Sequence, residues 1–244
     1  MKKKIVITGG AGFVGSNLIK YLLKKTKYNL ISVDNYSTGL RKNHIKSKRV
    51  KYIKSDTQNI NKVLKNPKTI HSLFHFGEFA RIYQSFLKME ECINSNTIGS
   101  NAVLNFCFSN KIKLIYSATS ATMGNKGDDK NLSPYAFTKA KNLELLDNLK
   151  KWFKFKFEII YFYNVYGPNQ ISSGSMATVI GIFEDLYKKK KPLTVVKPGI
   201  QSRRFTHIDD TVKACYVAWK KNKCRHYSIS NRESHSILEV AKMF

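Results

Sequence analysis

Short, continuously apolar runs alternate along the chain with longer stretches in which apolar residues recur every three to four positions. A continuous run is typical of a strand buried on both faces of a parallel sheet, and the wider spacing is typical of an amphipathic helix. The pattern therefore predicts an α/β protein, a doubly wound parallel sheet with helices on both faces. The expected strands are residues 4–8, 30–34, 50–53, 71–76, 112–117 and 157–162, and the expected helices include 13–25, 92–110 and 135–150.

The pattern loosens after residue 165, where glycines, prolines and short strand-like runs replace the regular alternation. We therefore expect a large domain over residues 1–165 and a small region over 166–244 that covers the sheet. The last helical pattern runs to residue 244, and we expect this C-terminal region to be shortened.

Composition narrows the class of protein without naming a function. The 244 residues are 42% hydrophobic, which argues against disorder, and their formal net charge is +27. Lysines at the ends of the expected elements supply nearly all of this excess, so we predict a solvated basic surface that attracts acidic small molecules. A nucleic-acid site would need aromatic residues and arginines gathered together, which the sequence lacks, and no nucleic-acid partner is expected.

The targeting and cysteine patterns indicate a cytoplasmic protein. No apolar run approaches the roughly 18 residues of a membrane span, and the apolar run after the N-terminal lysines is too short for a signal peptide. The cysteines, Cys92, Cys107, Cys215 and Cys224, are scattered without a C-x-x-C pair. We expect reduced thiols, no metal site and no contact with a membrane.

Three glycines follow the first expected strand and open the first expected helix. Gly9 permits a sharp turn, Gly12 lets the backbone approach a pyrophosphate at the helix N-terminus, and Gly15 lets the helix pack closely. Asp34 ends the second strand, where a carboxylate can accept hydrogen bonds from the adenosine ribose and repel the extra phosphate of NADP. The alternative, an ordinary turn residue before Asn35, is less favoured in this context. The stretch predicts NAD binding.

A second motif places Tyr135 and Lys139 four residues apart after a Ser-Pro helix start. Side chains at this spacing project from one helical face. A tyrosine has a pKa near 10, and a nearby ammonium group and a positive nicotinamide ring would both favour its phenolate form. The pair alone is common by chance, but after a dinucleotide loop it becomes the leading candidate for acid–base chemistry.

Motifs in this order resemble the extended short-chain dehydrogenase/reductase family and its nucleotide-sugar epimerase/dehydratase group, with UDP-glucose 4-epimerase-like proteins most similar. The matching segments are "TGGAGFVGSN" (8–17), "VDNYSTG" (33–39), "LFHFGE" (73–78), "NTIGSN" (96–101), "IYSATSATMG" (115–124), "YAFTK" (135–139), "YNVYGP" (163–168) and "RRFTHIDD" (203–210). They span nearly the whole chain and are jointly very specific.

The resemblance implies a role for each matching residue. Residues 1–165 would be the NAD-binding Rossmann domain, and 166–244 a partial substrate-binding region. The catalytic residues would be Thr119, Tyr135 as the base, and Lys139. The implied NAD-binding residues are Gly9, Gly12, Phe13, Val14, Gly15, Asp34, Asn35, Asp56, Phe76, Gly77, Asn96, Tyr135, Lys139 and Tyr163. The implied substrate-binding residues are Glu78, Arg81, Asn164 and Arg203, where Glu78 and Arg81 could instead form an internal ion pair.

Departures from the family's motifs narrow the reaction. Dehydratases of the group carry an Asp-Glu pair after the catalytic threonine, and Ser120 and Ala121 stand there. Heptose 6-epimerases place a lysine at the position of Ser173, and Met123 stands where a tyrosine is common. The resemblance therefore implies an NAD-dependent epimerase of a nucleotide sugar, with UDP-hexose as the expected substrate and a transient 4-keto sugar.

Two other functions stay open at this stage. One is an NAD-binding protein with lost or reduced activity, because the C-terminal lid is short, and the other is an ADP-heptose 6-epimerase-like enzyme. Helices 93–109 and 135–150 have one apolar face each, which the family uses for a homodimer contact and which an intramolecular contact would equally explain.

Overall fold

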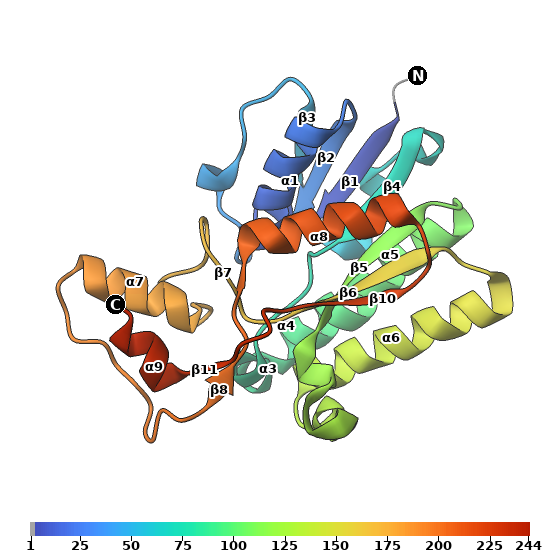
Figure 1. Cartoon of the computed structure of the whole chain (residues 1–244). Coiled ribbons are helices and arrows are strands. Elements are labelled where there is room, and N and C mark those ends of the chain that lie inside the picture. The colour runs from blue at the N-terminus through green and yellow to red at the C-terminus, as the bar shows by residue number, and fades with distance from the viewer. Residues whose placement is uncertain (1–2) are drawn as a thin grey trace.

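A parallel sheet forms the centre of the protein. The computed structural model describes residues 3–244, apart from the side chains of residues 125–127. The seven strands of this sheet run in the order β10-β6-β5-β4-β1-β2-β3, and all their pairings are parallel (Figure 1). They are β1 (Lys4–Thr8), β2 (Asn29–Asp34), β3 (Val50–Lys54), β4 (Ile70–His75), β5 (Lys113–Thr119), β6 (Phe157–Phe162) and β10 (His226–Ile229). The predicted fold class is confirmed.

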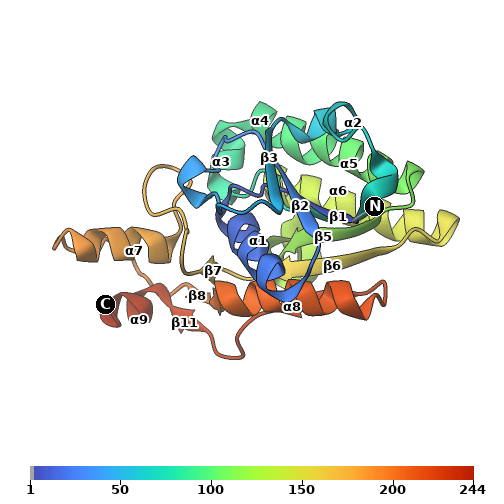
Figure 2. The same ribbon diagram turned by 90° about the horizontal axis from the view of Figure 1, so that it is seen from above.

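Helices cover both faces of this sheet. The α-helices of the described residues are α1 (Phe13–Lys25), α2 (Ile60–Val63), α3 (Ile82–Leu87), α4 (Met89–Ile93), α5 (Ser100–Ser109), α6 (Pro134–Phe153), α7 (Val179–Lys188), α8 (Ile208–Lys221) and α9 (Ile237–Lys242), of which α7 and α9 lie away from the sheet (Figure 1). Figure 2 shows α1 and α8 on one face and α2, α5 and α6 on the other. Each face buries its own apolar cluster, because strands such as β1 send Ile5 and Ile7 to one side and Val6 to the other.

The sequence pattern located most of these elements. The six expected strands and helix α1 are present with boundaries that agree within two residues. The expected helix 92–110 is divided into α4, a π-helical segment η4 (Asn94–Gly99) and α5. Strand β10 was not predicted, because its four residues alternate between exposed and half-buried positions at the edge of the sheet.

A small cluster stands apart from the sheet. Helices α7 and α9 lie together with the antiparallel pair β8 (Ser202–Arg203) and β11 (His235–Ser236), around the buried residues Phe183, Phe205 and Val240 (Figure 1). A second short pair joins β7 (Val165–Tyr166) to β9 (Thr206–His207). Between these parts the chain returns to the sheet through α8 and β10. The boundary expected at residue 165 stays a prediction.

The described residues contain neither a membrane-spanning helix nor a metal-binding cluster. None of their helices combines the length and the apolar character that crossing a bilayer requires. Within residues 3–244, no group of three or more histidines, cysteines or acidic residues is arranged to hold a metal ion.

A buried carboxylate attaches the edge strand β10 to the sheet. Glu158 in β6 is fully buried, and its two oxygens accept hydrogen bonds from the backbone N–H groups of Cys224 and Arg225, each at 3.1 Å. Lys113 in β5 places its ammonium group 3.2 Å from the same carboxylate. The segment that leads into β10 is therefore held by a charge-assisted contact, which is stronger than a neutral hydrogen bond.

We expect Glu158→Ala to lower the free energy of unfolding by about 3–5 kcal/mol, because Lys113 and two backbone donors lose their buried partner. Urea denaturation measures this. The matched control is Glu144→Ala, which breaks an exposed pair with Lys141 and should cost less than about 1 kcal/mol. Equal effects of the two substitutions would show that Glu158 does not hold β10.

Candidate active site

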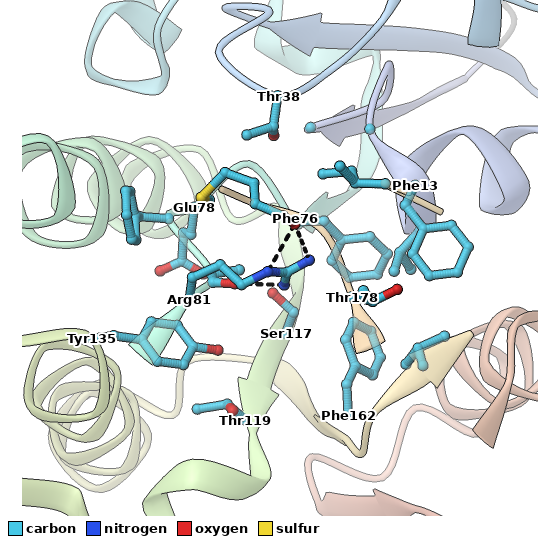
Figure 3. A pocket seen from close by; sticks show the side chains of 18 of the residues that line it. Phe13, Thr38, Phe76, Glu78, Arg81, Ser117, Thr119, Tyr135, Phe162 and Thr178 are labelled. Atoms are coloured by element: carbon cyan, nitrogen blue, oxygen red, sulfur yellow. Dashed lines mark hydrogen bonds between the residues drawn. The ribbon is translucent and has the colours of Figure 1, made fainter. Parts of the chain in front are cut away.

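A large cavity opens at the carboxyl ends of the strands. The strand order reverses between β1 and β4, and a ligand crevice is expected at such a switch point. The cavity has a volume of about 1410 Å³ and is lined from the ends of β1, β2, β4, β5 and β6 and from the C-terminal cluster. Figure 3 shows Phe13 and Phe162 on one side of the cavity and Glu78, Arg81 and Tyr135 on the other.

The glycine turn brings backbone N–H groups to the cavity. Gly9 has a left-handed backbone (φ +68°), and a Cβ atom there would lie 2.8 Å from the backbone nitrogen of Gly77. Helix α1 follows Gly12 with no side-chain cap and no acidic residue in its first turn, so its free N–H groups can bind an anion. Gly12, Phe13, Val14 and Gly15 all line the cavity, as expected for a pyrophosphate site.

Two glycines act differently from the expectation. Gly15 was expected to let the helix approach the sheet, and the atom in the way of its Cβ is instead the carbonyl oxygen of Gly9 in the turn. Gly10 was not singled out, yet a Cβ there would collide with the Ser32 hydroxyl. The adjacent glycines of "TGG" were the available signal for this second close contact.

Asp34, at the end of β2, lies beside the glycine turn, and its carboxylate is held in a fixed orientation. One carboxylate oxygen accepts the backbone N–H of Ala11 at 2.9 Å, and the other accepts that of Tyr36 at 2.8 Å. The remaining lone pairs are available to the cavity that Asp34 lines, where ribose hydroxyls could donate to them. Asn35 donates to Asp56 at 2.7 Å, so the structure brings the three predicted adenosine-side residues together.

Asn96 and Tyr163 do not line the cavity, although both were expected to bind the cofactor. Asn96 is fully buried and bonds the backbone of Phe79 through both its oxygen (2.7 Å) and its nitrogen (3.1 Å). The Tyr163 hydroxyl donates to the Met123 sulfur at 3.5 Å. Their polar groups are used within the protein, so Asn96 shapes the loop after β4 and Tyr163 packs outside the cavity wall.

The start of α6 positions the catalytic candidates. Ser133 caps this helix by accepting the N–H of Ala136 at 3.1 Å, and Pro134 occupies its first turn. Tyr135 and Thr119, the last residue of β5, point into the same part of the cavity (Figure 3). Burial raises the pKa of Tyr135 to about 12, while a hydrogen bond from Thr119 acts in the opposite direction.

The Lys139 ammonium group is paired with Glu78. Lys139 is 3% exposed and donates to the Glu78 carboxylate and to the Ser117 carbonyl oxygen. Glu78 also accepts from Ser100 at 2.6 Å and from Tyr116 at 2.8 Å. Burial alone would raise the pKa of Glu78, but the charge of Lys139 and the hydrogen bonds from Lys139 and Ser100 hold it below its usual value.

This pair corrects the expected partner of Glu78. Glu78 was expected either to contact the sugar or to form an internal ion pair with Arg81, and its ion-pair partner is Lys139. The charge of Lys139 is thereby compensated before any ligand binds. Glu78 also lines the cavity, so its contact with the sugar stays a prediction. The sequence signal was weak, because the two partners are 61 positions apart.

His75 connects this pair to the glycine turn. Its ring nitrogens lie 2.7 Å from the Thr8 hydroxyl and 3.0 Å from the Ser100 hydroxyl, and its side chain is fully buried. Burial lowers the pKa of His75 to about 4. His75 is therefore a core residue at the end of β4.

The expected substrate residues Arg81, Asn164 and Arg203 all line the cavity. Arg81 donates to the Met176 carbonyl oxygen through two nitrogens, at 3.0 and 2.6 Å. Asn164 has a left-handed backbone (φ +36°) and donates to the Arg204 carbonyl oxygen at 3.1 Å. Arg203 lies exposed in β8.

Because His75 is buried in its neutral form, the free energy of unfolding should fall as the solution becomes acidic. Unfolded histidine binds a proton below about pH 6.5, whereas folded His75 does so only near pH 4, so its contribution is lost as the pH falls through this window. We expect the free energy of unfolding, measured by urea denaturation, to fall between pH 7 and pH 5. This fall should be about 2 kcal/mol smaller in His75→Gln than in the wild type. Parallel losses in the two proteins would contradict the buried, neutral state.

Comparisons with known proteins agree with this geometry. The family model described as "NAD dependent epimerase/dehydratase family" matches residues 5–230. The chain is 29% identical to an uncharacterized UDP-glucose epimerase of Bacillus subtilis, covering 98% of this chain and 80% of the relative. It is 28% identical to an ADP-L-glycero-D-manno-heptose-6-epimerase of Brachyspira hyodysenteriae, covering 98% of this chain and 79% of that protein.

Solved structures share the fold. A UDP-N-acetylglucosamine 4-epimerase from Methanobrevibacter ruminantium matches with a TM-score of 0.89 at 24% identity, covering all of this chain and 81% of the other. A Thermus thermophilus UDP-glucose 4-epimerase complex with NAD matches with a TM-score of 0.86 at 23% identity, covering 98% and 81%. The glycine turn, the Asp34 carboxylate and the open helix N-terminus fit NAD, and the chain belongs to the NAD-dependent epimerase/dehydratase family.

Proposed function

We propose that this protein is an NAD-dependent nucleotide-sugar epimerase that acts at C4 of a UDP-hexose. The observation that supports this most strongly is the placement of Tyr135 and Thr119 in the cavity lined by the glycine turn and Asp34. NAD, when bound, accepts a hydride from the sugar carbon and returns it. The protein's own residues must then remove and return the proton of the sugar hydroxyl.

Tyr135 is the group that handles this proton. Its pKa of about 12 keeps the phenol protonated in the free protein, and a positive nicotinamide ring nearby would stabilise the phenolate. Thr119 can hydrogen-bond the same sugar hydroxyl, because both side chains face one part of the cavity (Figure 3). Lys139 and Glu78 hold the helix turn below Tyr135 in place through their buried contact.

The remaining proposed contacts concern the diphosphate and the cofactor. Asn164 and Arg203 supply an amide and a guanidinium group for the sugar-nucleotide diphosphate, a role that suits arginine. We retain Phe76 and Gly77 as cofactor contacts, since both line the cavity beside the glycine turn.

Two alternatives have some support. An ADP-heptose 6-epimerase-like reaction agrees with one relative, but Ser173 stands where such enzymes are expected to carry a lysine. A protein that binds NAD with lost or reduced activity is the other alternative, and the activity of the wild-type protein separates it from an active epimerase. Dehydration is disfavoured by Ser120 and Ala121 after Thr119.

We also propose a cytoplasmic homodimer. The two predicted contact helices expose Ile93 and Ile98 (in 93–109) and Phe137 (in 135–150), and the neighbouring α3 exposes Tyr83 and Phe86. Contacts link α3 to both α4 and α6, so these residues can form one surface. A helix-to-helix contact between two copies would remove it from water.

The Asp34 carboxylate should select NAD over NADP. The wild-type protein is expected to bind NAD at least about tenfold more tightly, because Asp34 would face the 2′-phosphate of NADP. Asp34→Ala should weaken the binding of NAD by about tenfold, because charge-assisted hydrogen bonds are lost. The difference between the affinities for NAD and NADP should then become smaller. Dissociation constants from calorimetry test this, with Asp147→Ala on the far end of α6 as control. Equal affinities in the wild type would refute the assignment.

Tyr135→Phe should lower the rate of interconversion of UDP-glucose and UDP-galactose by about 10²–10⁴-fold, because only the transferable proton is lost. NAD binding should change little. The matched control is Tyr163→Phe, whose hydroxyl contacts Met123 outside the cavity and should keep the activity. A Tyr135→Phe protein with full activity would exclude the phenol as the base, and an inactive wild type that binds NAD would favour the reduced-activity alternative.

A further inference from the structure

Arg81 places a positive charge inside the catalytic part of the cavity. It immediately precedes α3, and Figure 3 shows its guanidinium group pointing inward, in the same part of the cavity as the Tyr135 ring. Its partners are all neutral carbonyl oxygens: Met176 accepts from Nε and Nη2, and Ala80 accepts from Nη1 at 2.7 Å. Among the residues that the structure describes, no carboxylate lies within 4.0 Å of it.

The nearest candidate counter-ion is already used. Glu78 comes from the same loop, but its carboxylate is bound to Lys139, Ser100 and Tyr116. The charges of Glu78 and Lys139 cancel, so Arg81 leaves this end of the cavity with one uncompensated positive charge. Burial lowers the pKa of Arg81, as expected for a cation that has lost much of its water.

The hydrogen-bonding capacity of Arg81 is only partly used. A guanidinium group has five N–H donors, and three are bound to the Met176 and Ala80 carbonyl groups. One N–H remains on each of the two terminal nitrogens. Two donors on adjacent terminal nitrogens match the two oxygens of a carboxylate.

The position of Arg81 indicates which part of a ligand it meets. Tyr135 lies beside it, and the proposed function places the reacting hydroxyl of the sugar at Tyr135. The diphosphate is assigned to Asn164, which follows β6, and to Arg203, which lies in β8. A group that reaches Arg81 therefore belongs to the sugar ring.

We propose that Arg81 binds a carboxylate on the sugar, so that the substrate is a nucleotide-linked hexuronic acid rather than a neutral hexose. This inference rests on the proposed function, since it requires the sugar to lie at Tyr135, and it changes the class of sugar within that function. A carboxylate there would neutralise the one free positive charge near Tyr135 and leave the Glu78–Lys139 pair intact.

The test measures binding of UDP-glucuronate, UDP-glucose and UDP to the NAD-loaded protein by calorimetry. The wild type should bind UDP-glucuronate about 10–100-fold more tightly than UDP-glucose, in line with charge-assisted hydrogen bonds. Arg81→Gln should remove this preference and leave the affinities for UDP-glucose and UDP within about threefold. Arg81→Lys, which keeps the charge, should retain part of the preference.

Arg203→Gln is the matched control, because it should weaken all three ligands alike through the diphosphate. If Arg81→Gln also weakens all three alike, Arg81 serves the diphosphate and the inference is wrong. Equal binding of UDP-glucuronate and UDP-glucose by the wild type overturns the inference alone. If none of the three ligands binds to the folded, NAD-loaded protein, the proposed function fails with it.

Discussion

The buried contact between Glu78 and Lys139 is the constraint on which the Tyr135 end of the cavity depends. Both side chains are almost fully withdrawn from water, at 2% and 3% exposure, and an unpaired charge in such a place would be strongly destabilising. The contact joins the loop after β4 to helix α6. Because Tyr135 lies one helical turn before Lys139, this contact also determines where the Tyr135 ring can lie.

The same contact divides the charges of the cavity. At the adenosine end, Asp34 supplies a negative charge that two backbone N–H groups hold in place. At the Tyr135 end, the charges of Glu78 and Lys139 cancel, and the positive charge of Arg81 remains. A parallel sheet makes this separation natural, since the ends of β2 and β5 lie on opposite sides of the switch point between β1 and β4.

Much of this arrangement could be predicted from the sequence, for a physical reason. Strands such as residues 4–8 and 157–162 are buried on both faces, so their apolar runs mark them directly. The glycine turn and Asp34 depend on local backbone geometry, which short motifs record. The ion pair could not be predicted, because it depends on how residues 61 positions apart meet in the fold. The edge strand β10 was missed because half-buried residues leave no continuous apolar run.

The Thr8 hydroxyl determines the direction of a chain of hydrogen bonds through the core. Its oxygen accepts the backbone N–H groups of Phe76 and Gly77 at 3.1 and 3.0 Å, so its own hydrogen must point to Nδ1 of His75. Nε2 of the neutral ring then carries the hydrogen and donates to Ser100, which donates in turn to Glu78. The hydrogen bonds therefore all run one way, from the glycine turn to the Glu78 carboxylate. Their aligned dipoles favour a negative Glu78, so the tautomer of one histidine helps to maintain the charge of the site.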